Sequence, residues 1–175
     1  MAGVASVTRV FVVDTSYLDE LYGLPGWHDP AHREAILDRW EQEAKLGARF
    51  YVPAPVLFEL CNHIAQLPDG HHRHTLAGRV AQDVRDALSA LPPGWIVSRS
   101  AKDALLDVAT LLSSLDAFST QLAVSKIGLT DAAVIQESRR LKDRHLASGW
   151  PVHIWSKDVA LKACEPDQEP DPLCF

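Results

Sequence analysis

Val10-Phe11-Val12-Val13-Asp14-Thr15-Ser16 is the stretch of sequence that decides the fold. Its four apolar residues, all β-branched or aromatic, are typical of a buried strand in a parallel sheet whose two faces are both covered. The strand ends on a carboxylate and two hydroxyls, and ligands of open α/β sheets bind beyond the carboxyl ends of the strands. Asp14 is therefore a candidate functional residue. The alternative is that Asp14 only caps the helix that follows.

Three further short apolar runs are predicted to be strands, at residues 49–52, 95–98 and 152–155. Between them, apolar residues recur at helical spacing. The helices are expected at about residues 17–22, 31–46, 56–67, 76–91, 101–115, 119–127 and 131–146. Strands that alternate with helices predict an α/β domain with a mostly parallel central sheet.

The composition is typical of a globular protein with a sizeable core. The 175 residues fit one domain, and 47% of them are hydrophobic. No apolar run approaches the length of a membrane span, and the first residues do not resemble a leader peptide, so we expect a cytoplasmic protein with no membrane association. The three cysteines lack paired metal-type spacing, which argues against a disulfide framework or a zinc site. Cys61 is expected to be buried.

The negative charge is concentrated at the end of the chain. A formal net charge of −6 argues against a general nucleic-acid-binding surface. However, residues 165–175 contain four acids and no base, so the net charge does not exclude a nucleic-acid substrate. This segment also holds three prolines, and we expect residues 1–164 to form the domain and residues 165–175 a loosely ordered acidic tail.

Four carboxylates occupy comparable positions around the predicted strands. Asp14 follows the first strand, and Glu59 lies on the helix after the second. Asp131 begins the helix before the fourth strand, and Asp158 lies just past that strand. If the strands are parallel, all four positions lie near the same end of the sheet, where the side chains can converge on one cleft.

Clustered carboxylates point to a bound cation. They repel each other and raise one another's pKa unless a cation lies among them. Hard oxygen ligands of this kind suit Mg²⁺ or Mn²⁺. Such an ion lowers the pKa of a bound water and stabilises the leaving oxygen of a phosphodiester. The pattern therefore indicates metal-assisted phosphodiester hydrolysis.

The ordered motifs resemble those of the PIN domain family. They are Val13-Asp14-Thr15-Ser16, Glu59-Leu60, Leu129-Thr130-Asp131-Ala132 and Ser156-Lys157-Asp158. The resemblance covers residues 10–163. PIN domains are Mg²⁺- or Mn²⁺-dependent ribonucleases, and the commonest small bacterial members are VapC-like toxins of toxin–antitoxin modules. The resemblance implies a three-layer α/β/α sandwich and a metal-dependent endoribonuclease that is the toxin of such a module.

The resemblance also implies a role for each acid. Asp14, Glu59 and Asp131 would be the catalytic triad that holds the metal, and Asp158 would complete a second metal position or bind through water. The hydroxyls that would orient these carboxylates are those of Thr15 or Ser16, and of Ser156. The implied partners are an RNA substrate, a second copy of the chain and a cognate antitoxin or other regulatory protein.

Structural readings of the same residues stay open. Glu59 can be a solvated helix residue, although its helix is predominantly apolar and a carboxylate on such a helix needs a partner. Asp131 and Asp158 are also explained as residues at helix N-termini. At the level of function, the alternatives are a PIN-like nuclease of RNA processing or of DNA, and a non-catalytic PIN-like binding or scaffold subunit. The four acids count against a scaffold, which has no reason to hold repelling carboxylates together.

Other conspicuous residues have ordinary explanations. Residues 71–74, His-His-Arg-His, are expected to form a solvated loop rather than a metal site. Arg139 and Arg140 are expected on the wet face of a helix, where either can touch RNA. The five tryptophans are expected to pack in the core or an interface rather than to stack on bases. PIN toxins usually end with a further strand, for which only residues 172–175 are available here.

Overall fold

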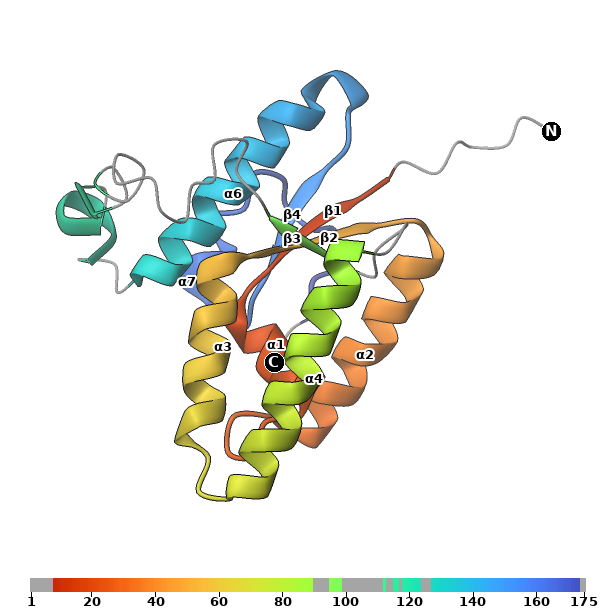
Figure 1. Ribbon diagram of the computed structural model, residues 1–175. Coiled ribbons are helices and arrows are strands. Elements are labelled where there is room, and N and C mark those ends of the chain that lie inside the picture. The colour runs from red at the N-terminus through yellow and green to blue at the C-terminus, as the bar shows by residue number, and fades with distance from the viewer. Residues whose placement is uncertain are drawn as a thin grey trace.

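Four parallel strands form one sheet in the computed structural model of the chain (Figure 1). The structure describes residues 8–89, 95–98, 112, 115–116, 118–123 and 127–173. The strands are β1 (Val10–Val13), β2 (Arg49–Pro53), β3 (Ile96–Ser98) and β4 (Val152–Trp155), and their order in the sheet is β3-β2-β1-β4. All four strands fall where the sequence predicts them, which confirms the α/β fold with a parallel sheet.

Strand β1 lies in the interior of the sheet, between β2 and β4. Val10 is in register with Arg49 of β2 and with Val152 of β4. All four β1 side chains are fully buried, as expected of an apolar strand covered on both faces. The N–H of Asp14 donates to the carbonyl of Trp155 over 2.9 Å, so β1 and β4 end side by side.

Helices cover both faces of this sheet. They are α1 (Thr15–Tyr22), α2 (Pro30–Lys45), α3 (Ala54–Gln66), α4 (Gly70–Ser89), α6 (Leu129–His145) and α7 (Val159–Lys162), with a π-helix at Phe118–Leu122 and a 3₁₀ helix at Leu146–Ser148. Figure 1 shows α6 on one side of the sheet and α1, α2, α3 and α4 on the other. The architecture is a three-layer α/β/α sandwich, as the resemblance of the motifs implies.

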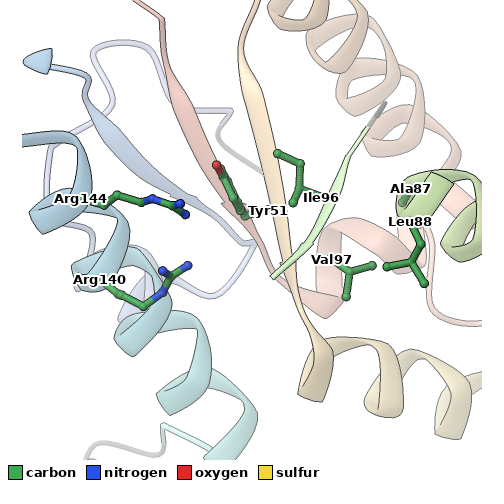
Figure 2. A pocket seen from close by; sticks show the side chains of 7 residues that line it. All are labelled: Tyr51, Ala87, Leu88, Ile96, Val97, Arg140 and Arg144. Carbon is green, nitrogen blue, oxygen red and sulfur yellow. The ribbon is translucent and has the colours of Figure 1, made fainter. Parts of the chain in front are cut away.

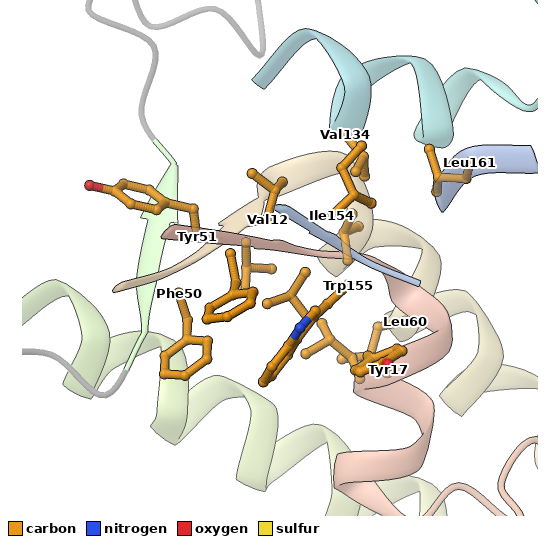
Figure 3. Close-up of a cluster of buried hydrophobic side chains, with 14 of the residues drawn as sticks. Val12, Tyr17, Phe50, Tyr51, Leu60, Val134, Ile154, Trp155 and Leu161 are labelled. Atoms are coloured by element: carbon orange, nitrogen blue, oxygen red, sulfur yellow. The ribbon is translucent and has the colours of Figure 1, made fainter. Parts of the chain in front are cut away.

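The alternation of side chains along the strands builds the two halves of the core. In Figure 3, Val12 and Ile154 point to the same side of the sheet as Val134 of α6, whereas Phe50 and Trp155 point to the opposite side. On that opposite side the aromatic rings pack closely. The ring centroids lie 4.4 Å apart for Phe11–Trp155 and 4.0 Å apart for Trp40–Phe50. Trp155 is thus a core residue, as predicted for the tryptophans.

The histidine-rich segment 71–74 is helical, and the prediction of a loop there is wrong. Helix α4 begins at Gly70 and includes all four residues. The backbone N–H of His72 donates to Asp69 Oδ1 over 2.8 Å, so Asp69 supplies the side-chain oxygen that a helix start requires. The turn signal at residues 68–70 therefore marks the beginning of the helix.

Several smaller expectations have mixed outcomes. Cys61 is exposed rather than buried. The helix expected at residues 101–115 lies almost wholly outside the described residues. Where residues 119–127 were expected to be helical, residues 118–122 form a π-helix. Within the described part of the chain, no helix has the length and apolar character needed to cross a membrane.

The acidic tail packs along the open edge of β4 and is not loosely ordered over its described residues. The N–H of Val152 donates to Asp167 Oδ2 over 2.8 Å, and that of Ile154 donates to Glu165 Oε2 over 3.1 Å. Residues 165–167 therefore run antiparallel to β4, and their carboxylates accept the hydrogen bonds that a fifth strand would accept. Lys142 Nζ in turn contacts Asp167 Oδ1 at 2.6 Å. Unpaired strand edges need such protection.

Glu169 anchors the next part of the tail. Its side chain is buried and accepts a hydrogen bond from Trp155 Nε1 over 3.3 Å. Lys162 Nζ and Arg39 Nη2 lie 2.7 and 3.2 Å from its two oxygens. Proline and negative charge in the sequence predict disorder, but three polar contacts hold this carboxylate against the domain.

We predict that Asp167→Ala lowers the free energy of unfolding by about 1–3 kcal/mol, because the Val152 N–H and Lys142 lose their shared acceptor. Urea denaturation at pH 7 measures the change. Asp171→Ala is the matched control, since the Asp171 side chain is 92% exposed and the substitution should change stability little. Equal effects of the two substitutions would contradict the structural role of Asp167.

The Asp167 contribution should also depend on pH in one direction. Burial raises the pKa of Asp167, but the hydrogen bonds from Lys142 and the Val152 N–H outweigh it and leave the pKa below its ordinary value. A carboxyl group with a lowered folded-state pKa stabilises the fold above its unfolded pKa, and this stabilisation disappears as the pH falls. The difference between wild type and Asp167→Ala should therefore shrink between pH 7 and pH 3.

Candidate functional site

Asp14 lies at the end of β1 with its carboxylate held by hydroxyl groups. Ser16 Oγ and Ser156 Oγ donate to Asp14 Oδ2 over 2.7 and 2.8 Å, and the Ser16 N–H reaches the same oxygen at 3.3 Å. The residue is 5% exposed. Burial raises the pKa of Asp14, and the two serine hydrogen bonds only partly oppose that rise. Asp14 is thus both the cap of α1 and a desolvated carboxylate.

The same two serines connect α1 to the loop after β4. Ser16 Oγ accepts the backbone N–H of Lys157 over 3.0 Å, and Ser156 Oγ accepts that of Asp158 over 3.0 Å. Each hydroxyl therefore accepts from the loop and donates to the carboxylate. These contacts match the orienting role predicted for Ser16 and Ser156, because they fix the position of Asp14 Oδ2 from two directions.

Glu59 approaches the site from α3. Val56, Leu60 and Ile64 of this helix are buried, so the helix packs closely against the domain, as the sequence indicates. Glu59 itself is half-buried, and its Oε2 accepts a hydrogen bond of 2.8 Å from Thr15 Oγ1. The partner that a carboxylate on a buried helix requires is therefore Thr15, which ties α3 to the first residue of α1.

Asp131 occupies the first turn of α6, and its Oδ2 accepts the N–H of Gly128 over 2.6 Å. Its pKa is raised, first by burial and then by the negative charges of Asp14, Asp158 and Glu59. Charges repel measurably only when they are close and poorly screened. The structure therefore brings the four predicted carboxylates to the same end of the sheet, with Asp14, Asp158 and Glu59 within electrostatic range of Asp131.

Asp158 is the most exposed of the four acids. Its Oδ1 accepts the backbone N–H groups of Ala160 and Leu161 over 2.7 and 3.2 Å, which makes it the cap of α7. The capping role weighed for Asp158 from the sequence is thus present. Its charge nonetheless contributes to the repulsion felt by Asp131.

The chemistry of this donor set fits Mg²⁺ or Mn²⁺, whereas its spacing is not that of an assembled metal site. Each of the four carboxylates receives the hydrogen bonds described above on a single oxygen. These oxygens are Asp14 Oδ2, Glu59 Oε2, Asp131 Oδ2 and Asp158 Oδ1. Hard cations favour such carboxylate oxygens. Among the residues that the structure describes, no group of three or more His, Cys, Asp or Glu side chains is arranged to hold a metal ion.

A second polar pair, Asp19 and His63, lies one helical turn from the pair formed by Thr15 and Glu59. His63 Nδ1 is 3.1 and 3.0 Å from the two carboxylate oxygens of Asp19. Burial raises the pKa of Asp19 to about 6, and His63 opposes the rise. Asp19 and His63 follow Thr15 and Glu59 by four residues each, so the same two helix faces meet again. This spacing is visible in the sequence, but it does not reveal which helices pack together.

Glu20 and Lys157 form a third contact that sequence reasoning did not assign. Lys157 Nζ lies 2.5 Å from Glu20 Oε1, and Glu20 is fully buried. The other Glu20 oxygen accepts the N–H of Asp29 over 3.0 Å. Lys157 stands between Ser156 and Asp158, so this ion pair clamps the loop that carries both residues onto α1. The two partners are 137 residues apart, and no local pattern indicates the pairing.

A pocket of about 260 Å³ lies elsewhere, beside β2 and β3 (Figure 2). Arg140 and Arg144 of α6 point toward Tyr51 in this view. The other lining residues are Ala87, Leu88, Ile96 and Val97, so none of the four carboxylates lines it. Arg140 is already paired with Glu137, with Nη2 2.6 Å from Oε1.

Comparisons with known proteins found no relative of this chain. A scan against protein-family models matched none, and searches of curated proteins and of solved structures found no similar protein. What the chain itself defines is a parallel α/β/α sandwich with four acids at the carboxyl end of its sheet.

We predict that Asp14→Asn raises the melting temperature at pH 7 when divalent cations are absent. The raised pKa means that ionised Asp14 opposes folding, and this penalty grows as the pH rises through the folded-state pKa. The asparagine amide carries no charge and can still accept the serine hydrogen bonds. The difference between variant and wild type should therefore be largest at neutral pH and small at pH 4.

Thermal unfolding with chelator present measures this effect. Asp38→Asn is the matched control, because Asp38 is exposed on α2, away from the four acids. The control should shift the melting temperature little at either pH. A melting temperature of Asp14→Asn at or below that of wild type at pH 7 would show that the carboxylates do not oppose folding.

Proposed function

We propose that the chain is a Mg²⁺- or Mn²⁺-dependent endoribonuclease of the PIN-domain type. The PIN resemblance of the four motifs supports this proposal, together with the fold they are expected to form. The toxin role, the cognate antitoxin and the homodimer stay predictions from that resemblance. The proposal for the chemistry has separate support in the carboxylate site.

The observation that carries the proposal is the set of four carboxylates that come from four separate elements, three of which repel the fourth, Asp131. Asp14, Glu59 and Asp131 each have a hydrogen bond that fixes one oxygen. Burial and mutual repulsion raise the pKa of Asp131, a cost that a fold keeps only for a compensating reason. A divalent cation among these oxygens would remove that cost.

Each residue then has a part in the proposed reaction. Asp14, Glu59 and Asp131 would hold the metal through their carboxylates, and Asp158 would contribute at the exposed side. The bound ion would supply a water of lowered pKa and charge stabilisation at the scissile phosphate. Ser16 and Ser156 would keep Asp14 in one orientation, and Lys157 would hold the loop that carries Ser156.

One observation favours a second candidate, a binding subunit without catalytic activity. Within the described ranges, no three potential ligands are arranged to hold a metal ion. A binding subunit would use the same end of the sheet without a cation. Metal binding separates the two candidates, because only the nuclease requires the carboxylates to gather around an ion.

We expect the purified protein to cleave labelled single-stranded RNA with Mg²⁺ or Mn²⁺ and to be inactive with chelator. Asp14→Asn should abolish cleavage, because it removes a charged ligand and leaves the fold intact. Asp38→Asn should retain full activity. Gel analysis of RNA and of single-stranded DNA measures both activity and preference. Activity that persists in Asp14→Asn, or no metal-dependent cleavage by wild type, would contradict the proposal.

Ser156→Ala should weaken metal binding without abolishing it. The variant loses a hydrogen bond that orients Asp14, and the loss of such an orienting contact typically costs about 10–100-fold in metal affinity or activity. The Mg²⁺ concentration that gives half the maximal cleavage rate should rise accordingly. Ser148→Ala, at an exposed residue in the 3₁₀ helix after α6, is the control and should leave that concentration unchanged.

A further inference from the structure

Trp27 presents a large aromatic ring at the surface although it is tightly held. The residue is 40% exposed, so of the two expected places, the core or an interface, Trp27 does not lie in the core. Its ring stacks on His63, with centroids 3.7 Å apart and ring planes 12° apart. We infer that Trp27 is a stacking platform for a base of single-stranded RNA. The inference rests on the proposed nuclease function and assigns a substrate contact beside the carboxylates.

The turn that carries Trp27 is fixed from both ends. Gly23 adopts a left-handed conformation with φ 64°, which ends α1 and reverses the chain. The N–H of Trp27 donates to the Leu24 carbonyl over 3.0 Å, and His28 Nδ1 lies 2.7 Å from the same oxygen. The Asp29 N–H is held by Glu20. A ring held in place before binding loses little conformational freedom when a base stacks on it.

The residue behind the indole ring is fixed as well. Both oxygens of Asp19 lie within hydrogen-bond distance of His63 Nδ1, and Asp19 is 4% exposed. The imidazole therefore cannot rotate away without leaving a buried carboxylate unpaired, which is costly. With one face of Trp27 covered by this imidazole, the exposed part of the indole is a rigid apolar surface rather than a mobile side chain.

The position of this stack relates it to the acids. His63 follows Glu59 by four residues on α3, and such residues have their Cβ atoms about 5–6 Å apart on one helix face. Asp19 follows Thr15 by the same spacing on α1. The pairs Thr15–Glu59 and Asp19–His63 are therefore successive contacts between α1 and α3, one helical turn apart. The Trp27 ring stacks on His63 of the second pair. A single-stranded RNA with one phosphate at Glu59 would therefore have a neighbouring base close to the Trp27 indole.

Base stacking suits this surface better than a phosphate contact. Bases of single-stranded nucleic acids stack on exposed aromatic rings with little sequence preference. The Lys157 ammonium, the positive charge in the loop beside the acids, is already paired with the fully buried Glu20. An apolar contact of this kind also helps a protein of net charge −6 to hold RNA.

The chain offers a matched control in Trp150. Its ring also stacks on a histidine, His145, with centroids 4.6 Å apart. It is half-buried, and the guanidinium of Arg49 lies 4.7 Å from its ring centre. Trp150 precedes Pro151, whose carbonyl accepts the N–H of Val10 at the start of β1. It is therefore at the opposite end of the sheet from the four acids.

Binding of a fluorescently labelled single-stranded RNA, measured by anisotropy on the Asp14→Asn protein, tests the inference. In that background Trp27→Ala should weaken binding by about 5- to 100-fold, the range for loss of one stacked base. Trp27→Phe should retain most of the affinity, because it keeps an aromatic face. Trp27→Leu should behave like Trp27→Ala, and Trp150→Ala should change affinity less than twofold.

Affinity that is unchanged in Trp27→Ala, or equal in Trp27→Leu and Trp27→Phe, would overturn the stacking platform, as would no RNA binding by the parent. A melting curve for each variant shows that it is folded. Failure of the two proposals is distinguishable. Wild-type cleavage at a rate that Trp27→Ala leaves unchanged would overturn the platform alone. Aromatic-dependent binding without metal-dependent cleavage would overturn the nuclease alone.

Discussion

The parallel pairing of β1 with both β2 and β4 is the constraint on which the rest of the structure depends. β1 is buried on both faces and hydrogen-bonded on both edges, and the residue that follows it is almost fully buried as well. Asp14 is that residue, and a carboxylate in such a place is costly unless it is hydrogen-bonded. Ser16 and Ser156 supply these bonds from the chain segments that the same pairing brings alongside.

Helix capping and carboxylate clustering are served by the same side chains. Asp14, Asp131 and Asp158 each give one oxygen to backbone N–H groups at a helix start. A cap of this kind is worth about 0.5–2 kcal/mol, and the positive end of the helix dipole also favours a nearby negative charge. These local terms offset part of the repulsion among the acids. Because each cap uses one carboxylate oxygen, a capping role for these acids does not exclude the proposed metal-binding role.

Local sequence signals predict the strands and most helices, and they fail where distant partners decide. The apolar run at residues 10–13 predicts a strand buried on both faces, and the structure confirms it, whereas the interior place of this strand in the sheet is known only from the structure. The sequence at residues 68–70 predicts a turn, whereas Asp69 caps a helix that begins at Gly70. The order of the tail depends on Lys142 and on Arg39, which is 130 residues from Glu169. Asp19 and His63 were missed for the same reason, because helical spacing indicates a face but not its partner.

The acidic side chains of the tail and those of the carboxylate site have different kinds of partner. Asp167 and Glu169 meet lysine or arginine side chains, so their charges are compensated inside the fold. Asp14 and Asp131 meet hydroxyls and backbone N–H groups instead, which orient a carboxylate without neutralising it. The ammonium groups of Lys142 and Lys162 and the guanidinium of Arg39 thus pair with the tail. The negative charge left at the carboxyl end of the sheet is the kind that a divalent cation, rather than a side chain, can balance.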